Sequence, residues 1–302
     1  MRIARSGRSL GAVRLFGTIG LALALCVSGE TGASDQAGQP RGLKVFISVD
    51  MEGLAGVATG SDVSPNGPDY GHFRKVMAGE TNAAIEGAAA AGATAFTVRD
   101  SHGAKQNLLP LDVDPRARLI RGATPGPKNM MEGIDQSFDA AIFIGYHARA
   151  GTPNAILAHT SNGNVTDFAI NGVSMPEAGY NALVAGLYEV PVVFIAGDRA
   201  FVEQARGMLG PVEAVATKFE TAGSVDSLSP AAAQTAIRAG VERGLKRRGE
   251  VRPYKLTPPY TMVLKVRADK PLYAGATRTG PGESRFAHAD LLEILNAFNA
   301  MK

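Results

Sequence analysis

Residues 45–53 read VFISVDMEG. The stretch begins as a mainly apolar run rich in β-branched residues, which is typical of a buried strand. It then places two carboxylates, Asp50 and Glu52, two residues apart. Burying a carboxylate is costly unless a cation or hydrogen bonds compensate its charge. This stretch therefore predicts a central strand of the fold and, at its carboxyl end, a site that neutralises two acids.

The N-terminus has the layout of a secretory signal peptide. Residues 2–14 carry four arginines and no acid, and an apolar stretch follows over 15–27. Small residues come next, with a predicted cleavage site after Ala33. Because the apolar stretch is short for a membrane span, we expect a cleaved signal peptide over 1–33 and a periplasmic or secreted protein. An uncleaved membrane anchor is the alternative.

Charge and cysteine content exclude several classes of function. Without residues 1–33, which carry four arginines and one glutamate, the chain is close to neutral. It has no basic patch interleaved with aromatic residues, so we expect no nucleic-acid partner. The single cysteine, Cys26, lies in the predicted signal peptide. The mature chain is therefore expected to have neither a disulfide framework nor a catalytic cysteine.

Strand and helix signals alternate along the chain. Strands are predicted at 43–50, 94–100, 117–122, 138–147 and 190–198. Strands that alternate with helices indicate an α/β fold, here a mostly parallel sheet flanked by helices. A polar leader is expected over 34–42, the α/β domain over 43–215, and a smaller α+β domain over 216–302.

Three later segments also carry structural predictions. Residues 154–161 and 165–175 are predicted to form paired strands, with Asn171-Gly172 as a turn signal. Pro176 is expected to start a helix. Residues 284–301 are predicted to form a final amphipathic helix that contains His288.

Polar residues recur where three of the predicted strands end. Asp50 and Glu52 follow the first strand, His102 lies in RDSHG after the second, and His147 lies in GYHAR after the fourth. Ligand sites in open α/β sheets lie beyond the carboxyl ends of the strands, so we expect these side chains to converge. Carboxylates and imidazoles suit Zn²⁺ or another borderline divalent metal. Each residue alone has a structural explanation, but the set predicts a metal site.

Other polar residues near these segments have two interpretations. Asp100 either orients a ligand histidine or caps the turn after its strand. Glu80 and Asn82 either support the site or belong to a solvated helix face, and His72 is interpreted as a surface or capping residue. Residues 34–302, which follow the predicted signal peptide, contain no HExxH, GxSxG or P-loop motif.

Four motifs in one order give a resemblance to a known family. SVDMEGLAG, RDSHG, GYHARAGTPNAILAHT and NGVSMPEAGYNALVAG occur at suitable spacings. From about residue 43 to 300 the chain resembles the DppA-like D-aminopeptidase family, a group of dinuclear zinc aminopeptidases. The resemblance implies two Zn²⁺ per chain and a catalytic role for His159 in LAHTS, as either nucleophile or acid–base group. The metal ligands that it implies are Asp50, Glu52, His102, His147 and Glu177.

The resemblance also implies an activity and an assembly. We expect an aminopeptidase that hydrolyses short peptides with an N-terminal D-amino acid, of the D-Ala type, outside the cytoplasm. The family's homodecamer implies a homo-oligomer, with no stable membrane partner. Two alternatives remain open: another dinuclear metallohydrolase, such as an amidase or phosphoesterase, and a non-catalytic periplasmic binding protein.

Overall fold

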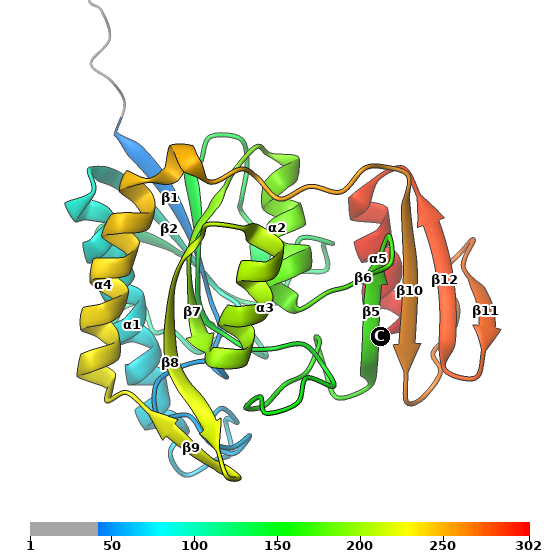
Figure 1. Cartoon of the computed structure of the whole chain (residues 1–302), viewed down its shortest axis with the longest axis horizontal. Coiled ribbons are helices and arrows are strands. Elements are labelled where there is room, and N and C mark those ends of the chain that lie inside the picture. The colour runs from blue at the N-terminus through cyan, green and yellow to red at the C-terminus, as the bar shows by residue number, and fades with distance from the viewer. Residues whose placement is uncertain (1–41) are drawn as a thin grey trace, which may run out of the picture. The chain divides into compact units, whose positions relative to one another are not determined.

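The computed structural model describes residues 42–302 (Figure 1). The predicted signal peptide at 1–33 lies outside the described residues, as does the leader except for Gly42. The described part contains a seven-stranded sheet and a five-stranded sheet. Among residues 42–302, no helix combines the length and the apolar character that crossing a bilayer requires.

The larger sheet is mostly parallel, with the strand order β3-β2-β1-β4-β7-β8-β9. All neighbouring strands are parallel except β8 and β9. The predicted α/β class is therefore confirmed. Its strands are β1 (Leu43–Val49), β2 (Ala93–Asp100), β3 (Ala117–Ile120), β4 (Ala140–Tyr146), β7 (Val192–Asp198), β8 (Glu213–Thr221) and β9 (Ser224–Ser227).

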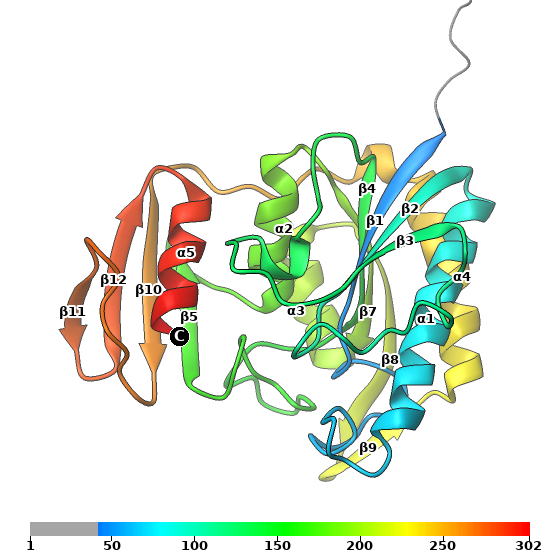
Figure 2. The same ribbon diagram turned by 180° about the vertical axis from the view of Figure 1, so that it is seen from behind.

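Helices cover both faces of this sheet (Figures 1 and 2). Alternate residues of β1 point to opposite faces: Val45 and Ile47 pack in the core with α1 and α4, whereas Phe46 packs in the core with α2 and α3. A Cβ at Gly87 in α1 would lie 2.3 Å from the carbonyl oxygen of Arg238 in α4, so this glycine permits close helix packing. The helices are α1 (Tyr70–Ala90), α2 (Glu177–Leu187), α3 (Arg199–Leu209), α4 (Pro230–Lys246), and the 3₁₀ turns η1 (Asn129–Met131) and η2 (Arg248–Glu250).

The strand order reverses between β1 and β4. From this point β2 and β3 extend the sheet in one direction, and β7 and β8 extend it in the other. Doubly wound sheets bind ligands outside the carboxyl ends of the strands at such a switch point. Asp50 directly follows β1 and His147 directly follows β4, so both lie where the topology favours a site.

The smaller sheet is antiparallel, with the order β11-β12-β10-β5-β6, and α5 packs on it (Figure 1). The rings of Phe168 in β5 and Phe298 in α5 stack at 3.9 Å, and Tyr180 in α2 lies against both. The hydrophobic core thus continues from α2 into the smaller sheet. These elements are β5 (Val165–Ile170), β6 (Val173–Ser174), β10 (Tyr260–Val266), β11 (Thr277–Gly280), β12 (Glu283–His288) and α5 (Leu291–Met301).

The chain crosses between the two sheets more than once. Strands β5 and β6 precede residue 215 and belong to the smaller sheet, whereas β9 and α4 follow it and belong with the larger sheet. The predicted boundary at residue 215 therefore divides the sequence without separating the two sheets.

The prediction that the last helix begins at residue 284 is wrong. Residues 283–288 form β12, and α5 begins only at Leu291, where the Asp290 side chain accepts a hydrogen bond from the Leu292 N–H at 2.9 Å. In β12, Ser284 and Phe286 are buried while the residues after each are exposed. This alternation has the period of a strand, and His288 is exposed at its end.

The predicted strand at 154–161 is also wrong. This segment is a loop, in which only an isolated bridge joins Thr160 to Asn162. Asn154 and Leu157 have φ values of 52° and 54°, which a strand does not adopt. The loop matters for function because it carries His159.

Candidate metal centre

The loop after β1 brings its two acids against the end of β4. The Asp50 N–H donates to the Ile144 carbonyl at 2.8 Å, and the Gly53 N–H donates to the Gly145 carbonyl at 2.7 Å. A Cβ at Gly53 would lie 1.9 Å from the carbonyl oxygen of Tyr146, so only glycine permits this approach. The acidic loop therefore closes on β4 beside the histidine that follows it.

His102 faces both acids of this loop. Its Nδ1 lies 3.2 Å from Asp50 Oδ1 and 3.0 Å from Glu52 Oε2. Its Nε2 lies 3.0 Å from the Val63 carbonyl oxygen, which can only accept and therefore requires a hydrogen on Nε2. In the neutral ring, the lone pair is then on Nδ1 and points at the carboxylates. A backbone carbonyl on the other ring nitrogen is the usual orientation device for a metal-binding histidine.

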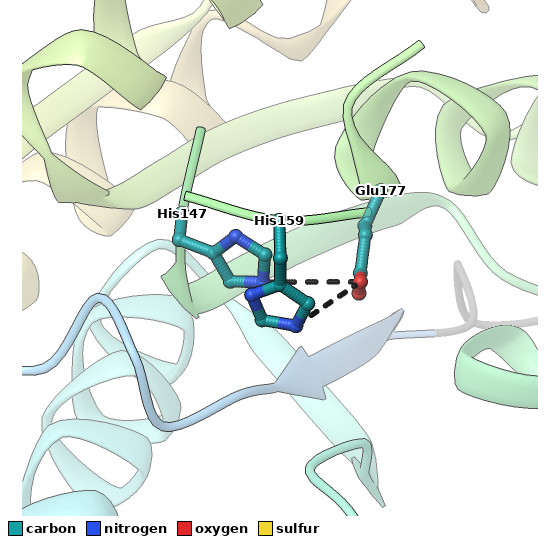
Figure 3. A group of neighbouring side chains, drawn as sticks. All are labelled: His147, His159 and Glu177. Carbon is teal, nitrogen blue, oxygen red and sulfur yellow. Dashed lines mark ion pairs between the residues drawn. The ribbon is translucent and has the colours of Figure 1, made fainter. Parts of the chain in front are cut away.

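His147 lies on the other side of Asp50. Its Nδ1 lies 3.0 Å from the Ala148 carbonyl oxygen. Its Nε2 lies 3.6 Å from Asp50 Oδ2 and 3.8 Å from Glu177 Oε1. Figure 3 shows this histidine and His159 pointing toward the carboxylate of Glu177. Asp50 thus presents one carboxylate oxygen to each of two histidines.

His159 stands next to His147 although its segment is a loop. The rings of the two histidines stack at 4.0 Å with an interplanar angle of 13°. The His159 N–H donates to the Ala148 carbonyl at 3.2 Å, which ties the loop to the end of β4. Its Nδ1 lies 2.9 Å from the Leu157 carbonyl oxygen, and its Nε2 lies 3.8 Å from Glu177 Oε1.

Three observations indicate that these residues suit a divalent metal. His147 Nε2 is buried and has no hydrogen-bond partner among the described residues, a situation that costs free energy unless something else satisfies the atom. Two ligands of a tetrahedral zinc lie about 3.4 Å apart, close to the separations around His147. Two groups have ligand atoms within 4.8 Å of one another: Asp50, Glu52 and His147; and His147, His159 and Glu177.

The acids change the protonation of the histidines. Burial alone would lower the pKa of His102, but Glu52 and Asp50 more than offset this effect and raise it to about 11. Burial likewise opposes protonation of His147, yet Glu177, Glu52 and Asp50 raise its pKa. Burial would raise the pKa of Glu52, but His102 holds it well below the usual range. Protons therefore neutralise the acids when no metal is bound, and a metal must displace them.

All six predicted site residues come together. Five of them line a cavity of about 330 Å³: Asp50, Glu52, His102, His159 and Glu177. The sixth, His147, has a fully buried side chain, whereas the side chain of His159 is 28% exposed. His159 belongs to one of the two candidate ligand groups and also lines the cavity. The division of the six residues into metal ligands and a catalytic residue stays a prediction.

Asp100 supports the site through the backbone. Its carboxylate accepts hydrogen bonds from the N–H groups of Asn107 and Leu108 at 2.6 and 2.8 Å, and from Asn107 Nδ2 at 2.8 Å. Asn107 Nδ2 also donates to the His102 carbonyl at 2.7 Å. Asp100 therefore fixes the turn that carries His102, which is the capping interpretation of this residue.

Two residues of α1 are not on a solvated face. Glu80 is buried, and its Oε1 accepts a hydrogen bond from the Ala55 N–H in the loop after β1 at 2.9 Å. Burial raises the pKa of Glu80 to about 7. Asn82 Nδ2 donates to the Asp112 carbonyl oxygen, and Asn82 Oδ1 accepts a hydrogen bond from the Asp114 N–H. Glu80 therefore supports the acidic loop, whereas Asn82 holds a different segment.

Two groups that support the site were not predicted from the sequence. The buried Nζ of Lys218 in β8 donates to the carbonyl oxygens of Glu52 and Val57, each at 2.5 Å. The Ser161 N–H donates to Glu177 Oε1 at 2.5 Å. Both contacts join segments distant in sequence. The neighbouring residues Thr217 and Lys218 are both buried. A strand with alternating buried and exposed side chains would place only one of them inside, so the sequence pattern does not predict that Lys218 is buried.

Comparison with known proteins gives one consistent result. A family model described as D-aminopeptidase matches residues 43–300. A D-aminopeptidase of Bacillus subtilis (strain 168) is 35% identical over 268 residues, which cover 86% of this chain and 96% of the relative. The solved structure of a protein described as Zn-dependent D-aminopeptidase DppA from Bacillus subtilis, a self-compartmentalizing protease, superimposes with a TM-score of 0.81 and 32% identity. The superimposed region covers 85% of this chain and 96% of the Bacillus subtilis chain.

The raised pKa of His102 predicts how the stability of the metal-free protein depends on pH. The pKa of His102 is about 11 in the folded protein and about 6.5 for an ordinary histidine, so protonated His102 stabilises the fold fully below about pH 6.5. This contribution should be lost as pH rises toward 11. We expect the free energy of unfolding, measured with urea in the presence of a chelator, to fall by more than about 1 kcal/mol between pH 6.5 and 9.

His102→Asn is the matched variant, because it removes the titrating group. It should show a flatter decline over the same pH range. An equal decline in both proteins would contradict the assignment of the effect to His102.

Proposed function

Because this chain belongs to the D-aminopeptidase family, we propose that it is a zinc-dependent aminopeptidase acting on short peptides with an N-terminal D-amino acid. One observation carries the proposal. Separate segments after β1, β2 and β4, together with the start of α2, supply three carboxylates and three imidazoles to one centre. The similarity to a zinc-dependent D-aminopeptidase supports zinc as the metal and a peptide as the substrate.

We propose two zinc ions per chain, with Asp50 shared between them. The support is that Asp50 Oδ1 faces His102 at 3.2 Å while Oδ2 faces His147 at 3.6 Å. Glu52 lies with the first histidine and Glu177 with the second. When bound, zinc supplies a Lewis acid that polarises a carbonyl group and lowers the pKa of a coordinated water.

His159 is suited to move a proton within the cavity. Its Nδ1 lies 2.9 Å from the Leu157 carbonyl oxygen, which requires a hydrogen on Nδ1. In the neutral ring, Nε2 is then free to take up a proton and to give it to a leaving amine. We therefore favour an acid–base role for His159. The alternative is a nucleophile, which would pass through an acyl-histidine.

Three finer parts of the proposal concern substrate, assembly and location. N-terminal D-alanine is the proposed residue at the cleaved end. A homo-oligomer is proposed because the similar Bacillus subtilis protein is described as self-compartmentalizing. Export from the cytoplasm is proposed from the signal-peptide layout of residues 1–33.

A substrate panel tests the activity directly. The zinc-loaded protein should hydrolyse D-alanine p-nitroanilide with a kcat/KM at least about tenfold above that for L-alanine p-nitroanilide, a difference of ~1.4 kcal/mol. A chelator should abolish turnover and added zinc should restore it. Hydrolysis of p-nitrophenyl phosphate in place of both anilides would identify a phosphoesterase. Absence of turnover on every substrate, with zinc bound, would identify a binding protein.

His159→Asn tests the proton-transfer role. The variant should fold and keep its zinc, yet its kcat should fall about 10²–10⁴-fold, the usual contribution of a positioned acid–base group. His72→Asn is a matched control, since His72 is exposed and packs only on Phe73 among ring contacts of the described residues. Loss of zinc from His159→Asn would make His159 a ligand. A trapped acyl-histidine in the native protein would make it the nucleophile.

A further inference from the structure

Two lysines line the same cavity as the acids. Lys105 lies in the loop after β2, and Lys302 follows the last residue of α5. The residues that line the cavity of about 330 Å³ thus include acids, histidines and two lysines. The chemistry proposed above uses the acids and imidazoles but gives the lysines no role.

Both ammonium groups have hydrogen-bond donors to spare. Lys105 Nζ donates to the Ser101 carbonyl oxygen, and Lys302 Nζ donates to Asn299 Oδ1 at 2.8 Å. Each ammonium has three donors. Among residues 42–302, neither lysine has an Asp or Glu side chain within ion-pair distance.

The two positive charges act on each other. Burial lowers the pKa of Lys302; Glu177 opposes this effect, and Lys105 adds to it. Two like charges at one partly desolvated wall repel, and an anion placed between them relieves the repulsion. This arrangement favours a ligand that carries a negative charge at one end.

We propose that Lys105 and Lys302 bind the C-terminal carboxylate of the peptide substrate, so that the enzyme selects short peptides with a free carboxyl end. This inference rests on the proposed aminopeptidase function. The cavity volume lies near the lower end of the range for small-ligand sites and suits a ligand of about dipeptide size. A zwitterionic dipeptide would place its amino end at the acids and its carboxylate at the lysines.

Thr124 also lines this cavity. Its Oγ1 is buried and has no hydrogen-bond partner among the described residues. The hydroxyl is covered in this structure, so Thr124 adds an unsatisfied polar group behind the wall and no direct contact to a ligand.

A pair of substrates that differ only at the carboxyl end tests the inference. The zinc-loaded protein should hydrolyse D-alanyl-D-alanine with a kcat/KM at least about tenfold above that for D-alanyl-D-alaninamide, mainly through KM. Equal kcat/KM values would overturn the carboxylate site while leaving the aminopeptidase function intact. Hydrolysis of neither substrate would overturn both.

Two variants assign the effect to the lysines. Lys105→Gln and Lys302→Gln should each reduce kcat/KM for the free acid about tenfold and change that for the amide less than about twofold. Lys246→Gln, at an exposed lysine of α4, should change neither. An equal loss on both substrates would mean that the lysines only hold the structure, which overturns the proposal. If one variant does not fold, the other variant and the native acid–amide comparison still decide.

Discussion

The burial of two carboxylates at the end of β1 is the constraint on which the rest of the site depends. Asp50 and Glu52 are 3% and 6% exposed, too buried for water to compensate their charge. Besides the Met51 N–H, which donates to Asp50 Oδ1 at 3.0 Å, cations or protonated imidazoles must balance this charge. The parallel sheet delivers the imidazoles, because β2 and β4 flank β1 and end beside it. The fold therefore brings the two buried carboxylates and the histidines that balance their charge to the same edge of the larger sheet. Metal binding and folding are coupled for this reason.

A second set of residues holds the acidic loop in place from outside the cavity. Glu80 accepts a hydrogen bond from the Ala55 N–H, Lys218 donates to two carbonyl groups of the loop, and Gly53 allows its close contact with β4. These contacts come from α1, β8 and the loop itself, so the position of the acids depends on the packing of the whole larger sheet. Substitution far from the cavity can therefore change metal binding by shifting this loop.

Sequence reasoning recovered the sheet class and the convergence of the site, because both follow from where apolar runs end and polar residues begin. It failed where the decisive interaction is long-range or the local pattern is ambiguous. Residues 283–288 read equally well as the start of an amphipathic helix until their pairing with β10 is known. The loop that carries His159 depends on backbone conformations with positive φ, and the contact of Lys218 with Glu52 spans 166 residues.

We propose that Asp50 is shared by two metal ions. Zinc content of the purified protein and of Asp50→Ala, measured by mass spectrometry beside the exposed control Asp269→Ala, tests it most directly. We expect about two zinc ions per chain in the native and control proteins and less than one in Asp50→Ala, because a shared ligand serves both positions. Full zinc content together with full activity in Asp50→Ala would contradict it.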